Sequence, residues 1–456
     1  MSISFTPDEL ATLRPLAAMF PTADVALAEL STLAATQQLT APAVHVISDV
    51  HGEYAKLRHV VNNASGSLRP MVEKLFARQL KPEQRHELLC LIYYPAETMR
   101  HLRPCWKSVD DRVNWVRKTV RLQFQIVREF ARTYRRRHVI GLVPQEYREL
   151  LEGLVSENMI ERGNAYVDAM IAARAEFDRD LAVVRAFSRL IRNLAVGELI
   201  VAGDLGDRGP RIDRVIDLLM QQPNVSLLWG NHDLSWMGAT LGNEALIATV
   251  LRFSIRYARI AQLEAGYGIS LEPLERLARE VYGSDPAERF TLKVEHAYDP
   301  LLLARMQKAI AIMQFKLEGQ LIARHPEWKL EHRNLLHRID LKKGVVEVDG
   351  TTYEMLDRNF PTIDPKKPYE LSPAEARAMA DLRELFTGST RLWQHMQWVA
   401  RRDVEAPRRR ADFPRVRTRG ERRDTTTAQR GRTRCGRSRD DGRVRRDHPP
   451  SFSRRG

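Results

Sequence analysis

The stretch Gly230-Asn231-His232-Asp233 decides the fold, because it is the third of three polar blocks that each follow a short apolar run. The first block is Asp49-Val50-His51-Gly52, and the second is Gly203-Asp204-Leu205-Gly206-Asp207-Arg208-Gly209. The apolar runs are rich in β-branched residues and span 43–48, 199–201 and 225–229. Such runs predict strands. Because ligand sites in open α/β sheets gather beyond the carboxyl ends of the strands, we expect the three blocks to meet at one sheet edge.

The residue types in the blocks are those of a centre with two metal ions. Hydrolysis of a phosphate ester at neutral pH needs a strong nucleophile and screening of the phosphoryl charge, which two divalent ions about 3.5–4 Å apart supply. Asp204 is the expected bridging ligand, and Asp49 with His51 is expected at one ion. Asn231 offers a neutral oxygen to the second ion. This mixture of oxygen and nitrogen ligands favours Mn²⁺, or Fe or Zn, over Ca²⁺.

Three further residues in the blocks are candidates for catalysis. His232 lies next to a ligand and suits a general acid that protonates the leaving alkoxide. Asp233 is expected to orient that imidazole and raise its pKa. Arg208 can bind a phosphate oxygen through its planar fork, while Asp207 fixes the loop. In contrast, His45, His59 and His395 have no ligand-like neighbours and are expected to be structural.

The positive charge of the chain is concentrated at its C-terminal end. The 456 residues carry a formal net charge of +14. Residues 401–456 contain 20 Arg, no Lys and 8 acidic residues, which leaves about +2 for residues 1–400. The main body is therefore nearly neutral, so the composition argues against a nucleic-acid-binding function for it.

Other features of the composition fit a cytoplasmic enzyme. The 3 cysteines have neither paired nor metal-finger spacing, so the sequence indicates no disulfide framework and no thiolate zinc site. The first residues do not match a signal peptide. No uncharged run approaches the roughly 20 residues that a membrane helix requires.

Helical patterns dominate the chain outside the three blocks. The hydrophobic stripes are Leu10, Leu13, Leu16 and Met19; Val113, Val116, Val120, Phe124 and Val127; Phe177, Leu181, Val184, Phe187, Ile191 and Leu194; and Met306, Ile310, Met313, Leu317 and Leu321. Ser108 and Asp111 predict a capping box before the second stripe. Asp349-Gly350 predicts the turn of a hairpin. We interpret the stripes as core packing rather than cofactor contacts.

These patterns divide the chain into five regions. Residues 1–61 are expected to contain an N-terminal helix and the first strand, and residues 62–195 a helical insertion, since 155 positions separate Asp49 from Asp204. The central core is expected at 196–240, and a helical region with the hairpin at 241–400. An arginine-rich tail follows at 401–456.

On the residues of the three blocks the chain resembles the calcineurin-like metallophosphoesterases, and within them the class III fructose-1,6-bisphosphatases of bacteria. The narrower resemblance rests on 48–54, 201–210, 229–233 and the long helical insertion, with further likeness at 336–340 and 359–364. It covers roughly residues 5–400. It implies an α/β fold, with a β-sandwich core flanked by helices and large helical insertions. It also implies Mn²⁺-dependent hydrolysis of fructose 1,6-bisphosphate to fructose 6-phosphate and phosphate, a step of gluconeogenesis.

The sequence departs from this family after about Arg402. Members continue with an apolar strand ending in a histidine and a later Gly-His motif, which complete the shell of the second metal, and neither is present here. The arginine-rich composition of 402–456 is typical of an out-of-frame, truncated product. His448 is a poor substitute ligand, and His296 is the candidate replacement. We therefore expect a weakened second metal site and reduced turnover.

Two other functions are open at this stage. A phosphoprotein phosphatase shares the three blocks, but such enzymes usually have glutamate where Asp233 stands, and their first two blocks lie closer together. The other reading is a catalytically inactive chain whose arginine-rich tail binds nucleic acid. The sequence identifies neither the sugar-binding residues nor any regulation. It also leaves the oligomeric state open, because the apolar faces of the helices could be buried against the core or against a second subunit.

Overall fold

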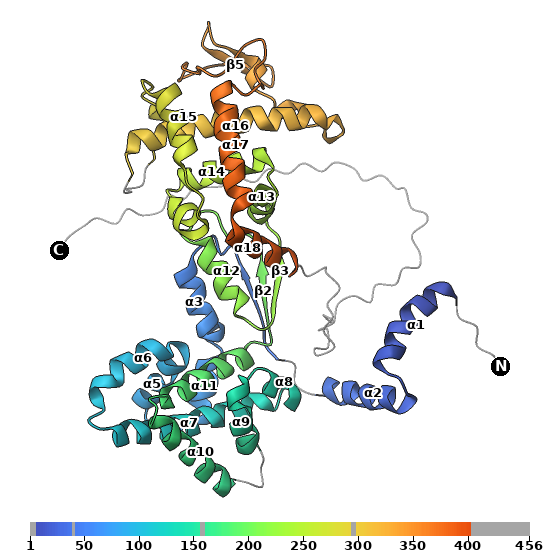
Figure 1. The fold of residues 1–456 in the computed structure, drawn as a ribbon, viewed down its shortest axis with the longest axis vertical. Helices are drawn as coiled ribbons and strands as arrows, with labels where there is room; N and C mark the ends of the chain where they lie inside the picture. Colours follow the sequence, from blue (N-terminus) through green and yellow to red (C-terminus); the bar gives the residue numbers. More distant parts are fainter. Residues whose placement is uncertain (1–5, 39–41, 156–159, 293–297, 403–456) are drawn as a thin grey trace, which may run out of the picture. The chain divides into compact units, whose positions relative to one another are not determined.

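A computed structural model of the chain describes residues 6–38, 42–155, 160–292 and 298–402 (Figure 1). These residues all belong to one compact unit, Met1–Pro414. The expectations for His296, His448 and the arginine-rich tail beyond Arg402 lie outside the described residues. The described part is an α/β structure in which helices predominate and two small sheets occur.

A parallel sheet connects the three polar blocks. Its strands are β1 (Val44–Ser48), β2 (Glu198–Ala202) and β3 (Val225–Leu228), in the order β1-β2-β3. Ser48 pairs with Ala202, and Ala202 pairs with Leu228, so the three carboxyl ends are level at one edge. The predicted strands are therefore confirmed. Since parallel strands all end at the same edge, this register delivers the residues that follow them to one place.

The two faces of this sheet differ in burial. Leu199 and Val201 are buried against the core, whereas Val44 and Val46 on the opposite face are 43% and 67% exposed. Alternate residues of a strand point to opposite faces, which is why a single strand can serve both environments. The sheet is thus packed against helices on one face, and the β1 part of its other face exposes the apolar side chains of Val44 and Val46.

A helical region with its own hydrophobic core lies between β1 and β2. Its core contains Val116, Val120, Phe187 and Ile191, among other residues between 64 and 195. The helices of this region, with α3 at its start, are α3 (Tyr54–Asn62), α4 (Leu68–Leu75), α5 (Pro82–Tyr93), α6 (Pro95–Leu102), α7 (Val109–Ala131), α8 (Arg136–Gly141), α9 (Arg148–Val155), α10 (Ile160–Ala175) and α11 (Asp180–Ala195).

The start of α7 bears out the predicted cap, with one change. The Ser108 hydroxyl accepts a hydrogen bond from the Asp111 amide at 3.0 Å, as expected for an N-cap residue. The Asp111 carboxylate accepts from the amide of Lys107, at 3.1 Å, rather than from that of Ser108. The Ser108 hydroxyl thus satisfies one orphan amide of the helix, and the Asp111 carboxylate binds the residue that precedes the cap.

A second hydrophobic core joins the parallel sheet to the helices that follow it. These helices are α12 (Ile212–Met220), α13 (Asn231–Thr240), α14 (Glu244–Arg256), α15 (Glu272–Tyr282), α16 (Pro300–Arg324), α17 (Pro373–Gly388) and α18 (Thr390–Ala400), with a π-helical turn at Gln262–Gly266. The predicted stripe in α16 is confirmed, since Met306, Ile310 and Met313 are fully buried.

The second sheet is antiparallel and is formed by β4 (Ile339–Asp340), β5 (Val345–Val348) and β6 (Thr351–Glu354). The predicted hairpin joins β5 to β6. Asp349 and Gly350 have φ values of 48° and 75°. Two consecutive positive φ values are what a two-residue turn requires to follow the twist of the strands.

Two expectations about apolar residues are wrong. Phe177 is 76% exposed and lies before α11, because Asp178 adopts a positive φ of 53° and the helix starts only at Asp180. Leu10, Leu16 and Met19 do lie on one helix, α1 (Pro7–Met19), but they are 37%, 45% and 62% exposed. Periodicity identified that helix without determining whether its apolar face is covered.

No single helix among the described residues has the length and apolar composition needed to cross a membrane. Helix α1 and most of α2 (Ala23–Gln37) meet that criterion when they are taken together, by length and composition alone, and the pair is bent by 88°.

Buried ion pairs connect α16 to its neighbours. The Lys316 ammonium group lies 2.7 Å from the Glu375 carboxylate, and both side chains are 0% exposed. Lys316 also donates to the carbonyl oxygen of Thr362 at 2.6 Å. Removal of one partner from such a pair leaves an uncompensated charge in the interior.

We expect Lys316→Met to lower the free energy of unfolding by about 3–5 kcal/mol, because Glu375 would remain buried without its counter-ion. Urea denaturation of the purified chain measures this loss. The double variant Lys316→Met/Glu375→Gln removes both charges and should recover most of it. A single variant as stable as the parent would contradict this account.

His395 is a core residue, as the sequence indicated. It is 3% exposed, and its Nδ1 and Nε2 atoms lie 3.2 Å from the Tyr267 hydroxyl and from the Asp217 carboxylate. Burial lowers the pKa of His395, and attraction by Asp217 offsets only part of that effect. The folded protein therefore favours the neutral imidazole.

Because the pKa of His395 is lower in the folded state, the unfolded chain binds this proton more readily. The free energy of unfolding should therefore fall as the pH drops from above the ordinary histidine pKa of about 6.5 toward the lowered value. His395→Gln should make the pH dependence shallower over that range in urea titrations. An unchanged slope in this variant would show that other groups cause the dependence.

Candidate metal centre

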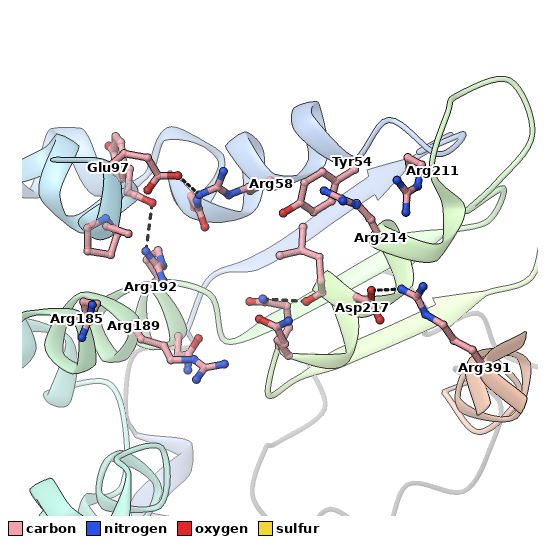
Figure 2. Close-up of a pocket in the computed structure, with 18 of the residues that line it drawn as sticks. Tyr54, Arg58, Glu97, Arg185, Arg189, Arg192, Arg211, Arg214, Asp217 and Arg391 are labelled. Carbon is pink, nitrogen blue, oxygen red and sulfur yellow. Dashed lines mark hydrogen bonds and ion pairs between the residues drawn. The ribbon is translucent and has the colours of Figure 1, made fainter. Parts of the chain in front are cut away.

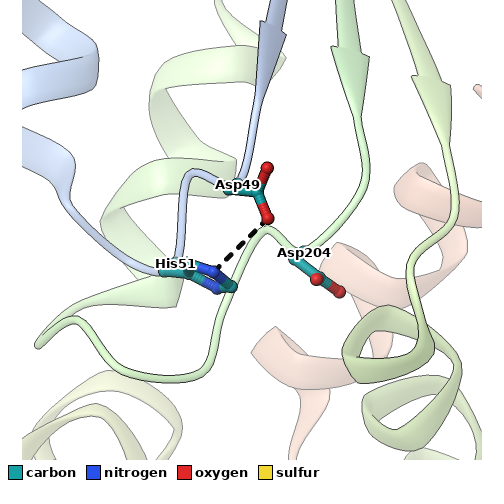
Figure 3. Close-up of side chains that lie close together, drawn as sticks. All are labelled: Asp49, His51 and Asp204. Atoms are coloured by element: carbon teal, nitrogen blue, oxygen red, sulfur yellow. Dashed lines mark ion pairs between the residues drawn. The ribbon is translucent and has the colours of Figure 1, made fainter. Parts of the chain in front are cut away.

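The first and second polar blocks bring three candidate ligands together beyond β1 and β2 (Figure 3). Asp49, His51 and Asp204 offer ligand atoms that all lie within 4.8 Å of one another. The His51 Nε2 atom is 3.6 Å from a carboxylate oxygen of Asp49. These residues have φ values of 51°, 48° and 52°, a conformation uncommon for residues other than glycine. Strained backbone of this kind concentrates at functional sites.

Backbone hydrogen bonds hold the two blocks against each other. The His51 amide donates to the Asp204 carbonyl at 2.8 Å, and the Gly52 amide donates to the Leu205 carbonyl at 2.7 Å. In return, the Gly209 amide donates to the His51 carbonyl at 2.5 Å. A Cβ at position 209 would lie 2.1 Å from that carbonyl oxygen, so only glycine fits. The ligand cluster thus depends on close contact between backbones.

The third block begins α13 and supports the Asp204 turn from the other side. The Asp233 carboxylate accepts hydrogen bonds from the amides of Gly230 at 2.9 Å, Asp204 at 2.8 Å and Leu205 at 2.9 Å. Burial raises the pKa of Asp233, these amides oppose the rise, and the negative charge of Asp204 adds to it. Asp233 therefore joins the second block to the third.

The expectation that Asp233 orients His232 is wrong. The carboxylate beside that imidazole belongs to Asp207, whose oxygen lies 3.2 Å from His232 Nε2. The Asp207 side chain is 1% exposed and also accepts from Arg208 Nε at 3.3 Å. Asp233 is adjacent in sequence, but the turn into the helix directs its carboxylate back to the backbone. No sequence signal distinguished these two acids, because the contact joins separate blocks.

Aromatic rings complete the surroundings of His232. Its ring centroid lies 5.0 Å from that of Phe253 in an edge-on arrangement and 6.4 Å from that of His51. The His232 side chain is 14% exposed, whereas that of Arg208 is 64% exposed. The imidazole is therefore held in place, whereas most of the Arg208 side chain is exposed, although its Nε atom lies 3.3 Å from Asp207.

Asp204 lies between the first block and the start of α13. Its carboxylate oxygen accepts from the His232 amide at 3.4 Å, while the same side chain belongs to the cluster with Asp49 and His51. Asn231 is the first residue of α13 and is exposed. The position of the Asp204 carboxylate, between the first block and the start of α13, suits a bridging ligand.

The residues present fit a metal ion. Among the described residues, His51 Nδ1 and one oxygen of Asp207 are buried without a hydrogen-bond partner. Buried polar atoms are rarely left unsatisfied, so these atoms indicate a missing partner. A cluster of two carboxylates and an imidazole has the donor set of Mn²⁺, Fe or Zn sites rather than of a thiolate site.

The last described residues lie along the outer edge of β3, the edge that pairs with no other strand of the sheet. The Leu227 amide donates to the Arg402 carbonyl at 2.8 Å, and the Trp229 indole donates to the Val399 carbonyl at 3.4 Å. Chain segments far apart in sequence therefore meet beside the third block. The candidate substitute ligand His296 lies outside the described residues, as does His448.

Comparisons with known proteins agree on one family. A family profile described as Firmicute fructose-1,6-bisphosphatase matches residues 11–403. A protein of Clostridium acetobutylicum named fructose-1,6-bisphosphatase class 3 is 37% identical over 399 residues, which are 86% of this chain and 59% of that protein. Proteins of the same name from Parabacteroides distasonis and Porphyromonas gingivalis are also 37% identical, over 86% and 85% of this chain. The chain spans about three fifths of the length of these relatives. No solved structure matches it.

The position of Gly230 provides a test of the metal centre. A Cβ there would lie 2.0 Å from Asp204 Oδ1 and 2.7 Å from the Asp204 amide nitrogen, so Gly230→Ala must displace that carboxylate. We expect Mn²⁺ affinity to fall by about 10–100-fold, the range for residues that support metal ligands. Calorimetric titration of the metal-free protein with Mn²⁺ measures this change.

Gly388→Ala is the matched control, because a Cβ at that position meets nothing within 4 Å. It should bind Mn²⁺ like the parent. Equal affinity in all three proteins would mean that Asp204 is not a ligand.

Proposed function

The chain belongs to the Firmicute fructose-1,6-bisphosphatase family, and we propose that it hydrolyses fructose 1,6-bisphosphate to fructose 6-phosphate and phosphate. This reaction is a step of gluconeogenesis. The single observation that carries the proposal is the cluster of Asp49, His51 and Asp204 at the carboxyl edge of the parallel sheet. A phosphate monoester is the kind of substrate that such a cluster suits.

The proposed cofactor is Mn²⁺. Asp49 and His51 would hold one ion, Asp204 would bridge, and Asn231 would face the second ion. When bound, the ions would screen the phosphoryl charge and supply the activated nucleophile. Among the described residues the second ion is offered fewer than the three protein ligands usual in catalytic sites, so we propose that it is held weakly.

Proton transfer and phosphate binding would be carried out by side chains of the chain itself. His232 would donate its proton to the leaving alkoxide of the sugar. Asp207 supports this role, because its buried carboxylate contacts the imidazole and fixes the orientation of the ring. Arg208 would bind an oxygen of the phosphate, because its side chain is 64% exposed while Asp207 holds its Nε atom. Asp233 would act indirectly, by holding the Asp204 turn.

The proposed architecture is the core of a calcineurin-like metallophosphoesterase, with helical insertions. The accessible apolar face that includes Val44 and Val46 supports it, because in a β-sandwich a second layer covers such a face. The boundaries expected from the sequence, at 61, 195, 240 and 400, belong to the same proposal. A reducing, cytoplasmic location is proposed as well, since Cys90 and Cys105 are free thiols.

The test is phosphate release from fructose 1,6-bisphosphate with added Mn²⁺, with metal content determined on the same sample. We expect slow, Mn²⁺-dependent release and about one tightly held ion per chain. His232→Asn should retain the metal and reduce the rate by about 10²–10⁴-fold, the range for loss of a general acid. Asp204→Asn should lose both metal and activity.

Three results would contradict the proposal. One is an unchanged rate in His232→Asn, and another is faster release from a phosphopeptide than from the sugar bisphosphate. The third, two tightly held ions with rapid turnover, would mean that the second site is complete and that residues outside the described part supply its ligands. Gly388→Ala serves again as the neutral control.

A further inference from the structure

A large cavity lined by arginines lies beside the parallel sheet (Figure 2). Its volume is about 820 Å³. Its walls come from α3, α6, α11, α12 and α18, and none of the candidate metal ligands lines it. The arginines lining it are Arg58, Arg185, Arg189, Arg192, Arg211, Arg214 and Arg391, against two acidic residues, Glu97 and Asp217. The cavity is therefore a strongly cationic site separate from the metal centre.

Three of these arginines are neutralised within the protein. Arg58 pairs with Glu97. Arg391 lies 2.6 Å from Asp217, and Arg211 lies 2.6 Å from the buried Asp213. These pairs fix part of the wall and are structural ion pairs.

Four arginines have no such partner. Among the described residues, no carboxylate lies within ion-pair distance of Arg185, Arg189, Arg192 or Arg214. Arg192 donates to the carbonyl oxygens of Ile92 and Tyr93, at 2.7 and 3.2 Å, which positions it without neutralising it. Burial, followed by repulsion from Arg189 and Arg58, lowers the pKa of Arg192 to about 10. The protein thus holds like charges together at a cost to its own stability.

The arrangement of these groups is that of a binding site. Arg185, Arg189 and Arg192 follow one another along a single face of α11, at the spacing of successive helical turns. Arg214 extends from α12 on the opposite side of the cavity in Figure 2, with its guanidinium 6.0 Å from the centre of the Tyr54 ring. The lining also includes neutral hydrogen-bonding side chains, those of Asn62, Asn193, Gln221 and Gln222.

We propose that this cavity binds a small molecule that carries two or more phosphate groups. Guanidinium groups match phosphate oxygens in geometry and charge, and clusters on opposite walls suit anionic groups at two ends of one ligand. The cavity has the size of ordinary small-molecule sites. A ligand bound there would connect α11, which belongs to the helical region, with α12 of the sheet core. The proposal does not depend on the phosphatase activity.

Inorganic tripolyphosphate is the probe, titrated calorimetrically into the full chain in EDTA, so that the metal centre holds no ion. We expect saturable binding of one molecule per chain and a rise in the thermal midpoint with probe concentration. Arg189→Gln/Arg214→Gln removes one unpaired cation from each wall and should weaken binding by at least about tenfold. Both side chains are exposed, so this variant should fold.

The matched control is Arg128→Gln/Arg279→Gln, which removes two exposed arginines that do not line the cavity. It should bind the probe like the parent, as should Asp204→Asn. Without probe, the cavity variant should melt no lower than the control, because it relieves repulsion. The proposal is overturned if the cavity variant binds as tightly as the control, or if Asp204→Asn abolishes binding. Tighter binding of a single-stranded oligonucleotide, lost in the same cavity variant, would also overturn it in favour of a nucleic-acid surface.

Discussion

The close backbone contact between the first two polar blocks is the constraint on which the rest of the structure depends. The amides of His51 and Gly52 donate to the second block, and the amide of Gly209 donates back to His51. These bonds require left-handed backbone at Asp49, His51 and Asp204 and exclude any side chain at position 209. The parallel sheet supplies the framework, because its register places both loops at the same edge.

Two buried carboxylates near this contact, those of Asp233 and Asp207, have different roles. Asp233 accepts three backbone amides and joins the start of α13 to the Asp204 turn. Asp207 faces His232, a group that can carry a proton. The distinction follows from what each side chain meets: amides fix a carboxylate as a structural acceptor, whereas an imidazole beside it makes an acid–base pair. The metal cluster and the proposed proton donor are thus held by separate acids.

Helix α11 connects the two halves of the described structure. One face, with Val184, Phe187 and Ile191, is buried in the core of the helical region. Another face carries the arginines of the cavity, opposite α12. Because α12 follows the second polar block directly, an anion bound between these helices would act on elements next to the metal centre. The insertion therefore contributes a charged wall to the sheet core as well as a hydrophobic core of its own.

The sequence by itself determined the strands, the α7 cap, the β5–β6 turn and the polar blocks, because each rests on residues close together in the chain, where spacing and turn chemistry act directly. Tertiary structure alone decided that Asp207 rather than Asp233 meets His232, that Phe177 and the apolar face of α1 are exposed, and that arginines of α11 and α12 share a cavity. Those outcomes depend on contacts between segments distant in sequence, and local periodicity carries no information about which segments will meet.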